Sequence, residues 1–125
     1  MTENELSRII VDSAFKVHNT LGPGLLETVY RAALAHELRK RDLTVAEERG
    51  IPALYEDIAL ELGFRADIIV NNKVIIEVNS IETLAPIHGK ILLTYLRLTD
   101  IRLGLLINFN VELIKDGIRR VVNNL

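Results

Sequence analysis

The fold is decided by residues 64–80, which read FRADIIVNNKVIIEVNS. Two runs rich in Ile and Val, Phe64–Val70 and Lys73–Val78, have the composition of buried β-strands. Between them lie two asparagines, residues 71–72, which are typical of a hairpin turn. The stretch therefore predicts two antiparallel strands inside a sheet, and the rest of the chain must cover them.

The flanking sequence supplies both helices and further strands. Apolar spacing predicts helices over Glu3–Thr20, Leu25–Arg41 and Pro86–Leu98, and strands over Leu43–Glu48, Ile51–Tyr55, Ile58–Leu62 and Ile101–Phe109. Residues 118–122 fit either a last short strand or a helix end. We therefore expect an α/β fold, with a mixed central sheet flanked by helices in a single domain over residues 1–125.

Composition narrows the classes of protein. Fifteen Lys and Arg face seventeen Asp and Glu, so the chain is not a polybasic nucleic-acid binder. The absence of cysteine removes disulfides, thiolate zinc sites and thiol catalysis. No apolar run approaches the ~20 residues of a membrane helix, and the N-terminal sequence lacks a signal-peptide core. These features predict a cytoplasmic protein that does not enter a membrane.

Two acidic residues interrupt the apolar strands, Asp67 in the first and Glu77 in the second. Whether their side chains meet depends on the turn, because strand residues alternate between the two faces of a sheet. A turn of two residues would set Asp67 opposite Ile76 and place Glu77 on the other face. A turn of three residues, 71–73, would set Asp67 directly opposite Glu77.

Two facing carboxylates in an apolar sheet repel each other and are costly to bury without a cation between them. A hard divalent ion such as Mg²⁺ meets that need, because it prefers oxygen ligands. The alternative is simple ion pairing, of Asp67 with Arg65 and of Glu77 with Lys73.

Five ordered segments carry a family likeness: GLLETVY at residues 24–30, FRADIIV at 64–70, VIIEVNS at 74–80, APIH at 85–88 and GLLINFN at 104–110. The first fits the pattern GxxExxY, and together they resemble the GxxExxY family of the PD-(D/E)XK nuclease superfamily. The resemblance runs from about Leu6 to Arg120, nearly the whole chain.

The resemblance implies a restriction-endonuclease-like core that hydrolyses phosphodiester bonds of nucleic acid with a divalent metal. By this likeness Asp67 and Glu77 would hold Mg²⁺ or Mn²⁺, and Glu27 would add a further catalytic carboxylate. Tyr30 and His88 would lie on the substrate side, although Tyr30 could simply pack and His88 could simply cap its helix. Nucleic acid is the implied partner, and a homodimer is the implied assembly.

The chain departs from the family pattern at two positions. Asn79 stands where the family has its catalytic lysine, and Ile91 stands where a glutamine usually follows the histidine. Three explanations remain open: a non-catalytic domain that still binds metal, nucleic acid or protein, an active enzyme in which Lys90 replaces the lost lysine and contacts substrate, or engineered substitutions. The sequence thus predicts a nuclease-like protein impaired at Asn79, with a binding or regulatory module as the alternative.

Overall fold

The computed structural model describes all of residues 1–125. The elements follow one another as α1 (Glu3–Leu21), α2 (Glu27–Lys40), β1 (Val45–Tyr55), β2 (Ile58–Val70), β3 (Val74–Asn79), α3 (Pro86–Thr99), β4 (Leu103–Asn108), the short 3-10 helix η1 (Ile114–Gly117) and β5 (Ile118–Val122). None of the helices is long and apolar enough to cross a membrane.

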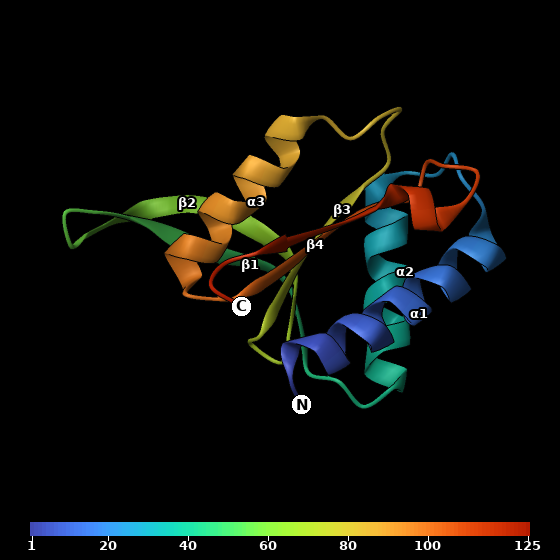
Figure 1. Ribbon diagram of the computed structural model, residues 1–125, viewed down its shortest axis with the longest axis horizontal. Helices are drawn as coiled ribbons and strands as arrows, with labels where there is room; N and C mark the ends of the chain where they lie inside the picture. The colour runs from blue at the N-terminus through green and yellow to red at the C-terminus, as the bar shows by residue number, and fades with distance from the viewer.

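One five-stranded sheet, in the order β1-β2-β3-β4-β5, runs through the molecule. Strands β3 and β4 pair in parallel, and the other three pairs are antiparallel. Helices α1 and α2 lie on one side of the sheet and α3 lies on the other (Figure 1). The connection from β3 to β4 passes through α3, as a parallel pair requires. The predicted mixed sheet flanked by helices is confirmed.

The sheet separates two hydrophobic cores. The larger core lies under α1 and α2, and the smaller one lies under α3 and includes Leu92 and Leu96. Strand β4 is buried along its whole length, which explains why residues 103–108 are almost wholly apolar. Helix α1 begins with a reciprocal capping pair of Thr2 and Glu5, which satisfies backbone donors at its start.

Two strand predictions were wrong in their boundaries. The separate strands expected at 43–48 and 51–55 form the single strand β1, and those expected at 58–62 and 64–70 form β2. The intervening Gly50 and Gly63 mark close approaches between the two strands rather than turns. A Cβ on Gly63 would lie 2.9 Å from the backbone of Ala53, and one on Gly50 would lie 2.8 Å from the side chain of Leu62. The undecided residues 118–122 form β5.

Two other glycines, Gly117 and Gly89, provide a matched test of how closely the fold is packed around them. A Cβ at Gly117 would lie 2.1 Å from the carbonyl oxygen of Asn108, so Gly117→Ala should destabilise the fold at the upper end of the usual ~1–3 kcal/mol for overpacking. At Gly89, inside α3, a Cβ meets no atom closer than 3.9 Å, so Gly89→Ala should stabilise the fold by up to ~1 kcal/mol. Urea denaturation of both variants checks the opposite signs, and equal effects would contradict this packing.

Candidate functional site

Asp67 on β2 and Glu77 on β3 occupy facing positions of the central hairpin. In the β2–β3 ladder, Ile68 pairs with Ile76 and Val70 pairs with Val74. The turn between the strands therefore has three residues, 71–73, and the next pair outward is Asp67 and Glu77. This is the register that the paired-carboxylate hypothesis needs, because it puts both acids on one face of the sheet.

The two carboxylates have different surroundings. One oxygen of Asp67, Oδ2, accepts a hydrogen bond of 2.8 Å from the backbone N–H of Val78. The Oε1 atom of Glu77 is buried and has no hydrogen-bond partner. Burial, and then the negative charge of Asp67, raises the pKa of Glu77 to about 9. Without a cation, Glu77 is therefore protonated at neutral pH.

The alternative of simple ion pairing does not occur in the structure. Neither Arg65 nor Lys73 takes part in any of the chain's ion pairs. The Lys73 ammonium instead donates a hydrogen bond to the carbonyl oxygen of Met1. The pair of acids thus has no cationic side chain to balance it, and its negative charge remains to be offset by a proton or by an ion from solution.

A cavity of about 210 Å³ lies between the sheet and α3 beside this pair. It is lined by Glu77, Asn79, His88, Ile91, Leu92, Tyr95 and Leu106. Glu77 and Asn79 are two residues apart on β3, so they share its α3 face. The Nδ2 atom of Asn79 is buried without a hydrogen-bond partner. The cavity therefore holds an unpartnered carboxyl oxygen and an unpartnered amide nitrogen, and no lysine or arginine lines it.

Helix α3 supplies the other wall of the cavity. The Nδ1 atom of His88 accepts a hydrogen bond of 2.8 Å from the backbone N–H of Ala85, so the ring's proton is on Nε2. His88 therefore caps the start of α3 through Nδ1, as one expectation had it. It also lines the cavity, where the other expectation placed a substrate contact. Ile91 presents an apolar side chain there. Lys90 is exposed and does not line the cavity, so the structure does not bring it to the lost lysine's position.

Glu27 and Tyr30 come from the start of α2. The Oε1 atom of Glu27 accepts a hydrogen bond of 3.4 Å from the backbone N–H of Ser80, just after β3. Its negative charge also contributes to the raised pKa of Glu77. Glu27 nevertheless lines a different hollow, of about 410 Å³, together with Ser80 and Leu25. It is therefore an acidic neighbour of the site and not part of the cavity under α3.

The structure gives Tyr30 a different task from substrate contact. Its side chain is fully buried, and its ring stacks on Phe109 with 4.6 Å between centroids. The hydroxyl donates to the carbonyl oxygen of Gly22 and accepts from the N–H of Leu25 at 3.1 Å. Tyr30 thus fixes the loop before α2, as expected for a packing residue, and we do not retain it as a substrate ligand.

Sequence reasoning missed two residues. Tyr95 lines the cavity, and burial together with the charges of Glu77 and Asp67 raises its pKa. Tyr95 follows His88 by seven residues, or two helical turns, so the sequence places both on one face of the helix. This spacing could have identified Tyr95 as a residue of the same site. Asn108 is buried at the end of β4, where its amide donates to the carbonyl oxygen of Ile81 and accepts from the N–H of Ile81. It holds the segment that follows β3.

A model of the PD-(D/E)XK nuclease superfamily matches residues 4–121, nearly the whole chain. The chain belongs to the PD-(D/E)XK nuclease superfamily. Neither a curated protein nor a solved structure matches it significantly. The five-stranded mixed sheet flanked by helices is consistent with the fold of this superfamily.

The residues present fit the divalent ion that PD-(D/E)XK nucleases usually use. No set of three or more His, Asp or Glu side chains converges on one point, so only the pair Asp67 and Glu77 would supply protein ligands to such an ion. Mg²⁺ is commonly held by one or two carboxylates together with water and substrate oxygens. The orphaned Oε1 atom of Glu77 is the oxygen that such an ion would satisfy.

The raised pKa of Glu77 predicts a pH-dependent stability. The folded chain holds this proton up to about pH 9, whereas the unfolded chain releases it near 4.5. The contribution of this proton to the free energy of unfolding is complete below pH ~4.5. It declines by up to ~1.4 kcal/mol per pH unit between pH ~4.5 and about 9, and it is lost above the folded-state pKa. Glu77→Gln removes the titrating group, so its advantage over the parent should grow from pH 5 to pH 9.

Urea denaturation at pH 5, 7 and 9 in chelator measures this difference. Glu112→Gln, on an exposed residue outside the central hairpin, is the control and should follow the parent at every pH. Parallel curves for the parent and Glu77→Gln would contradict the burial of an uncompensated carboxyl group.

Proposed function

We propose that the chain is a metal-dependent phosphodiesterase of the GxxExxY type that cleaves nucleic acid at a reduced rate. The observation that carries the proposal is the buried Oε1 atom of Glu77, which has no hydrogen-bond partner, at a strand position opposite Asp67. A protein gains nothing for its stability from such an atom. Its presence beside a second carboxylate, in a nuclease superfamily, supports a site for Mg²⁺ or Mn²⁺.

Asp67 and Glu77 would hold the ion through one oxygen each. A bound divalent ion makes water more acidic and offsets charge on a phosphate group. The hydrogen bond from Val78 fixes the Asp67 carboxylate, so one ligand is positioned before any ion arrives. The other ligand must lose its proton on binding, because burial raises the pKa of Glu77 to about 9.

Two side chains of the cavity are suited to polar contacts with the substrate. The Nδ2 atom of Asn79 can donate to the attacking water or to a phosphate oxygen. The Nε2–H of His88 can donate to a phosphate oxygen, because Nδ1 is held by Ala85. Both groups are neutral donors, so neither offsets the negative charge that develops on the phosphate. This is the physical reason to expect a slow enzyme.

A non-catalytic binding module is the second candidate. The observation that favours it is the lining of the cavity, which includes the apolar Ile91 and no lysine or arginine. Such a protein would bind nucleic acid or another protein with metal bound, and it would not cleave. The two candidates differ in one measurable property, turnover.

Cleavage of labelled single- and double-stranded DNA and RNA in Mg²⁺ or Mn²⁺ tests the proposal. We expect slow cleavage by the parent and none by Asp67→Asn. Asn79→Lys should be at least ~10-fold faster than the parent, because it restores a positive charge two residues after Glu77. Asp42→Asn, an exposed acid at a positive φ that asparagine tolerates, is the control and should match the parent.

Calorimetric titration with Mn²⁺ separates metal binding from turnover. Binding by the parent and its loss in Asp67→Asn would support the site even where cleavage is slow. Equal cleavage by the parent and Asp67→Asn would contradict the assignment. Metal-dependent binding of oligonucleotides without cleavage by the parent or Asn79→Lys would establish the binding module instead.

A further inference from the structure

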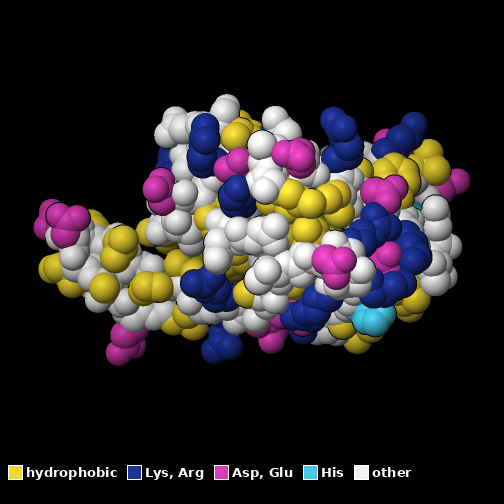
Figure 2. Space-filling model, turned by 90° about the horizontal axis from the view of Figure 1, so that it is seen from below, with side chains coloured by type: hydrophobic (Ala, Val, Ile, Leu, Met, Phe, Trp, Pro, Cys, Tyr) yellow, Lys and Arg dark blue, Asp and Glu magenta, His cyan; other side chains and the backbone are white.

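The hairpin of β1 and β2 extends beyond the rest of the sheet as an arm, residues 51–62. Figure 1 shows that no helix covers its outer part, and Figure 2 shows hydrophobic side chains along it with acidic groups at its end. Five large apolar side chains of the arm are each more than half exposed: Leu54, Tyr55, Ile58, Leu60 and Leu62. An exposed apolar ribbon of this kind marks an interaction surface.

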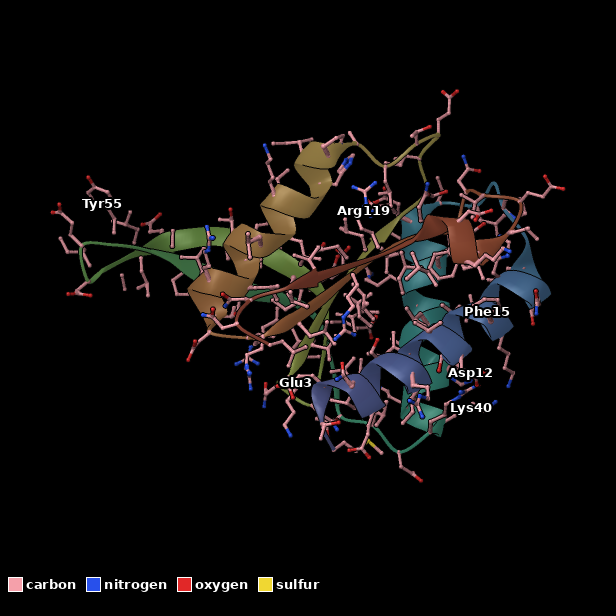
Figure 3. The ribbon with its side chains drawn as sticks, in the orientation of Figure 1. Glu3, Asp12, Phe15, Lys40, Tyr55 and Arg119 are labelled. Atoms are coloured by element: carbon pink, nitrogen blue, oxygen red, sulfur yellow. The ribbon has the colours of Figure 1, made fainter.

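Both faces of the arm are apolar. Tyr55 pairs with Ile58 across the strands and shares one face with it, whereas Leu54 pairs with Ala59 and shares the other. Figure 3 shows Tyr55 at the far end of the arm, away from the helices. A two-stranded ribbon with nothing packed on either face is marginally stable in water. The arm therefore presents an apolar surface that a partner would stabilise by covering it.

A cavity of about 280 Å³ lies at the base of the arm. Most of its lining is apolar and comes from β1, β2, the end of α3 and the segment that follows α3: Ile51, Pro52, Leu54, Ile69, Leu98 and Ile101. We refer to it as the base cavity. The same chain thus presents an exposed apolar tip and an apolar hollow that runs along the same hairpin from Leu54 to its base.

Acidic residues lie at the tip of the arm, and basic residues lie near its base. The turn at the tip is formed by Glu56 and Asp57, while Arg49 and Arg65 lie near the base at adjacent positions of the two strands, on opposite faces of the ribbon. Arg49 also lines the base cavity. None of these four residues forms an ion pair within the chain. When two such arms lie antiparallel, each acidic tip meets a basic base, so the surface is complementary to a second copy of itself.

We propose that two copies of the chain associate through their arms about a two-fold axis, with Tyr55 and Ile58 of each tip seated at the partner's base cavity. The arm and the lining of that cavity together involve about 18 residues of each copy, close to the roughly 20 that a standard interface of ~800 Å² per partner uses. The aromatic anchor in an apolar pocket is the usual centre of such an interface.

Sedimentation equilibrium of the full chain tests the association. The parent should be a dimer, and Ile58→Lys with Leu60→Lys should raise the dimer dissociation constant at least ~30-fold. The matched control is Leu113→Lys, which changes an equally exposed leucine outside the arm and should leave the dimer intact. Circular dichroism confirms that each variant is folded, which is expected because the altered side chains are exposed.

Charge reversal tests the antiparallel arrangement. One variant carries Glu56→Arg and Asp57→Arg at the tip, and the other carries Arg49→Glu and Arg65→Glu at the base. Each alone places like charges at both contacts and should be mainly monomeric. An equimolar mixture places opposite charges at both contacts and should form a heterodimer. A mixture that stays monomeric while the parent dimerises would overturn this arrangement.

The absence of cysteine allows a direct check of the tip-to-base contact. Asp57→Cys mixed with Arg49→Cys should give a disulfide-linked heterodimer under mild oxidation, and Asp57→Cys alone should not cross-link. A parent that is monomeric at ~100 μM would overturn the proposal. A monomer that instead binds phosphatidylcholine–phosphatidylglycerol vesicles through the arm would also overturn it, since it would assign the arm to a lipid surface.

Discussion

The three-residue turn between β2 and β3 is the constraint on which the candidate site depends. Because the turn has an odd number of residues, Val70 pairs with Val74. Continuing this register away from the turn brings Asp67 opposite Glu77. A turn one residue shorter would place the two acids on opposite faces of the sheet. Asn71 and Asn72 make this turn possible, because both adopt positive φ values that asparagine tolerates better than most residues.

The elements around that pair are fixed independently of it. Asn108 ties the segment after β3 to the end of β4, and Arg119 of β5 donates to the carbonyl oxygen of Ala85 at the start of α3. Leu92 of α3 packs over Gly104, where a Cβ would lie 2.8 Å from the leucine side chain. The cavity walls are therefore held by packing and backbone contacts, so the unpartnered atoms of Glu77 and Asn79 lie between elements anchored by contacts of their own.

Sequence patterns predicted the helices, the layered arrangement and the condition under which Asp67 meets Glu77. They could not decide the turn length, because Asn71-Asn72 fits turns of either size. They also split β1 and β2 at glycines, since a glycine at a close strand approach has the same local signature as one in a turn. The separation of Glu27 from the α3 cavity depends on how α2 docks, and spacing along the chain carries no information on that.

In the proposed site, Asn79 stands where the family pattern has a lysine, and this neutral side chain would change the charge balance of the site more than its shape. A lysine beside Glu77 would keep that carboxyl group ionised and ready to bind a cation. With a neutral amide there, and with Ile91 on the opposite wall, burial favours the protonated acid. In the proposed site a proton and a divalent ion would compete for the same oxygen atoms, so metal affinity would rise as the pH approaches the pKa of Glu77. With Asn79 in place of a lysine, the proposed site would carry a charge that depends on whether it binds a proton or a divalent ion.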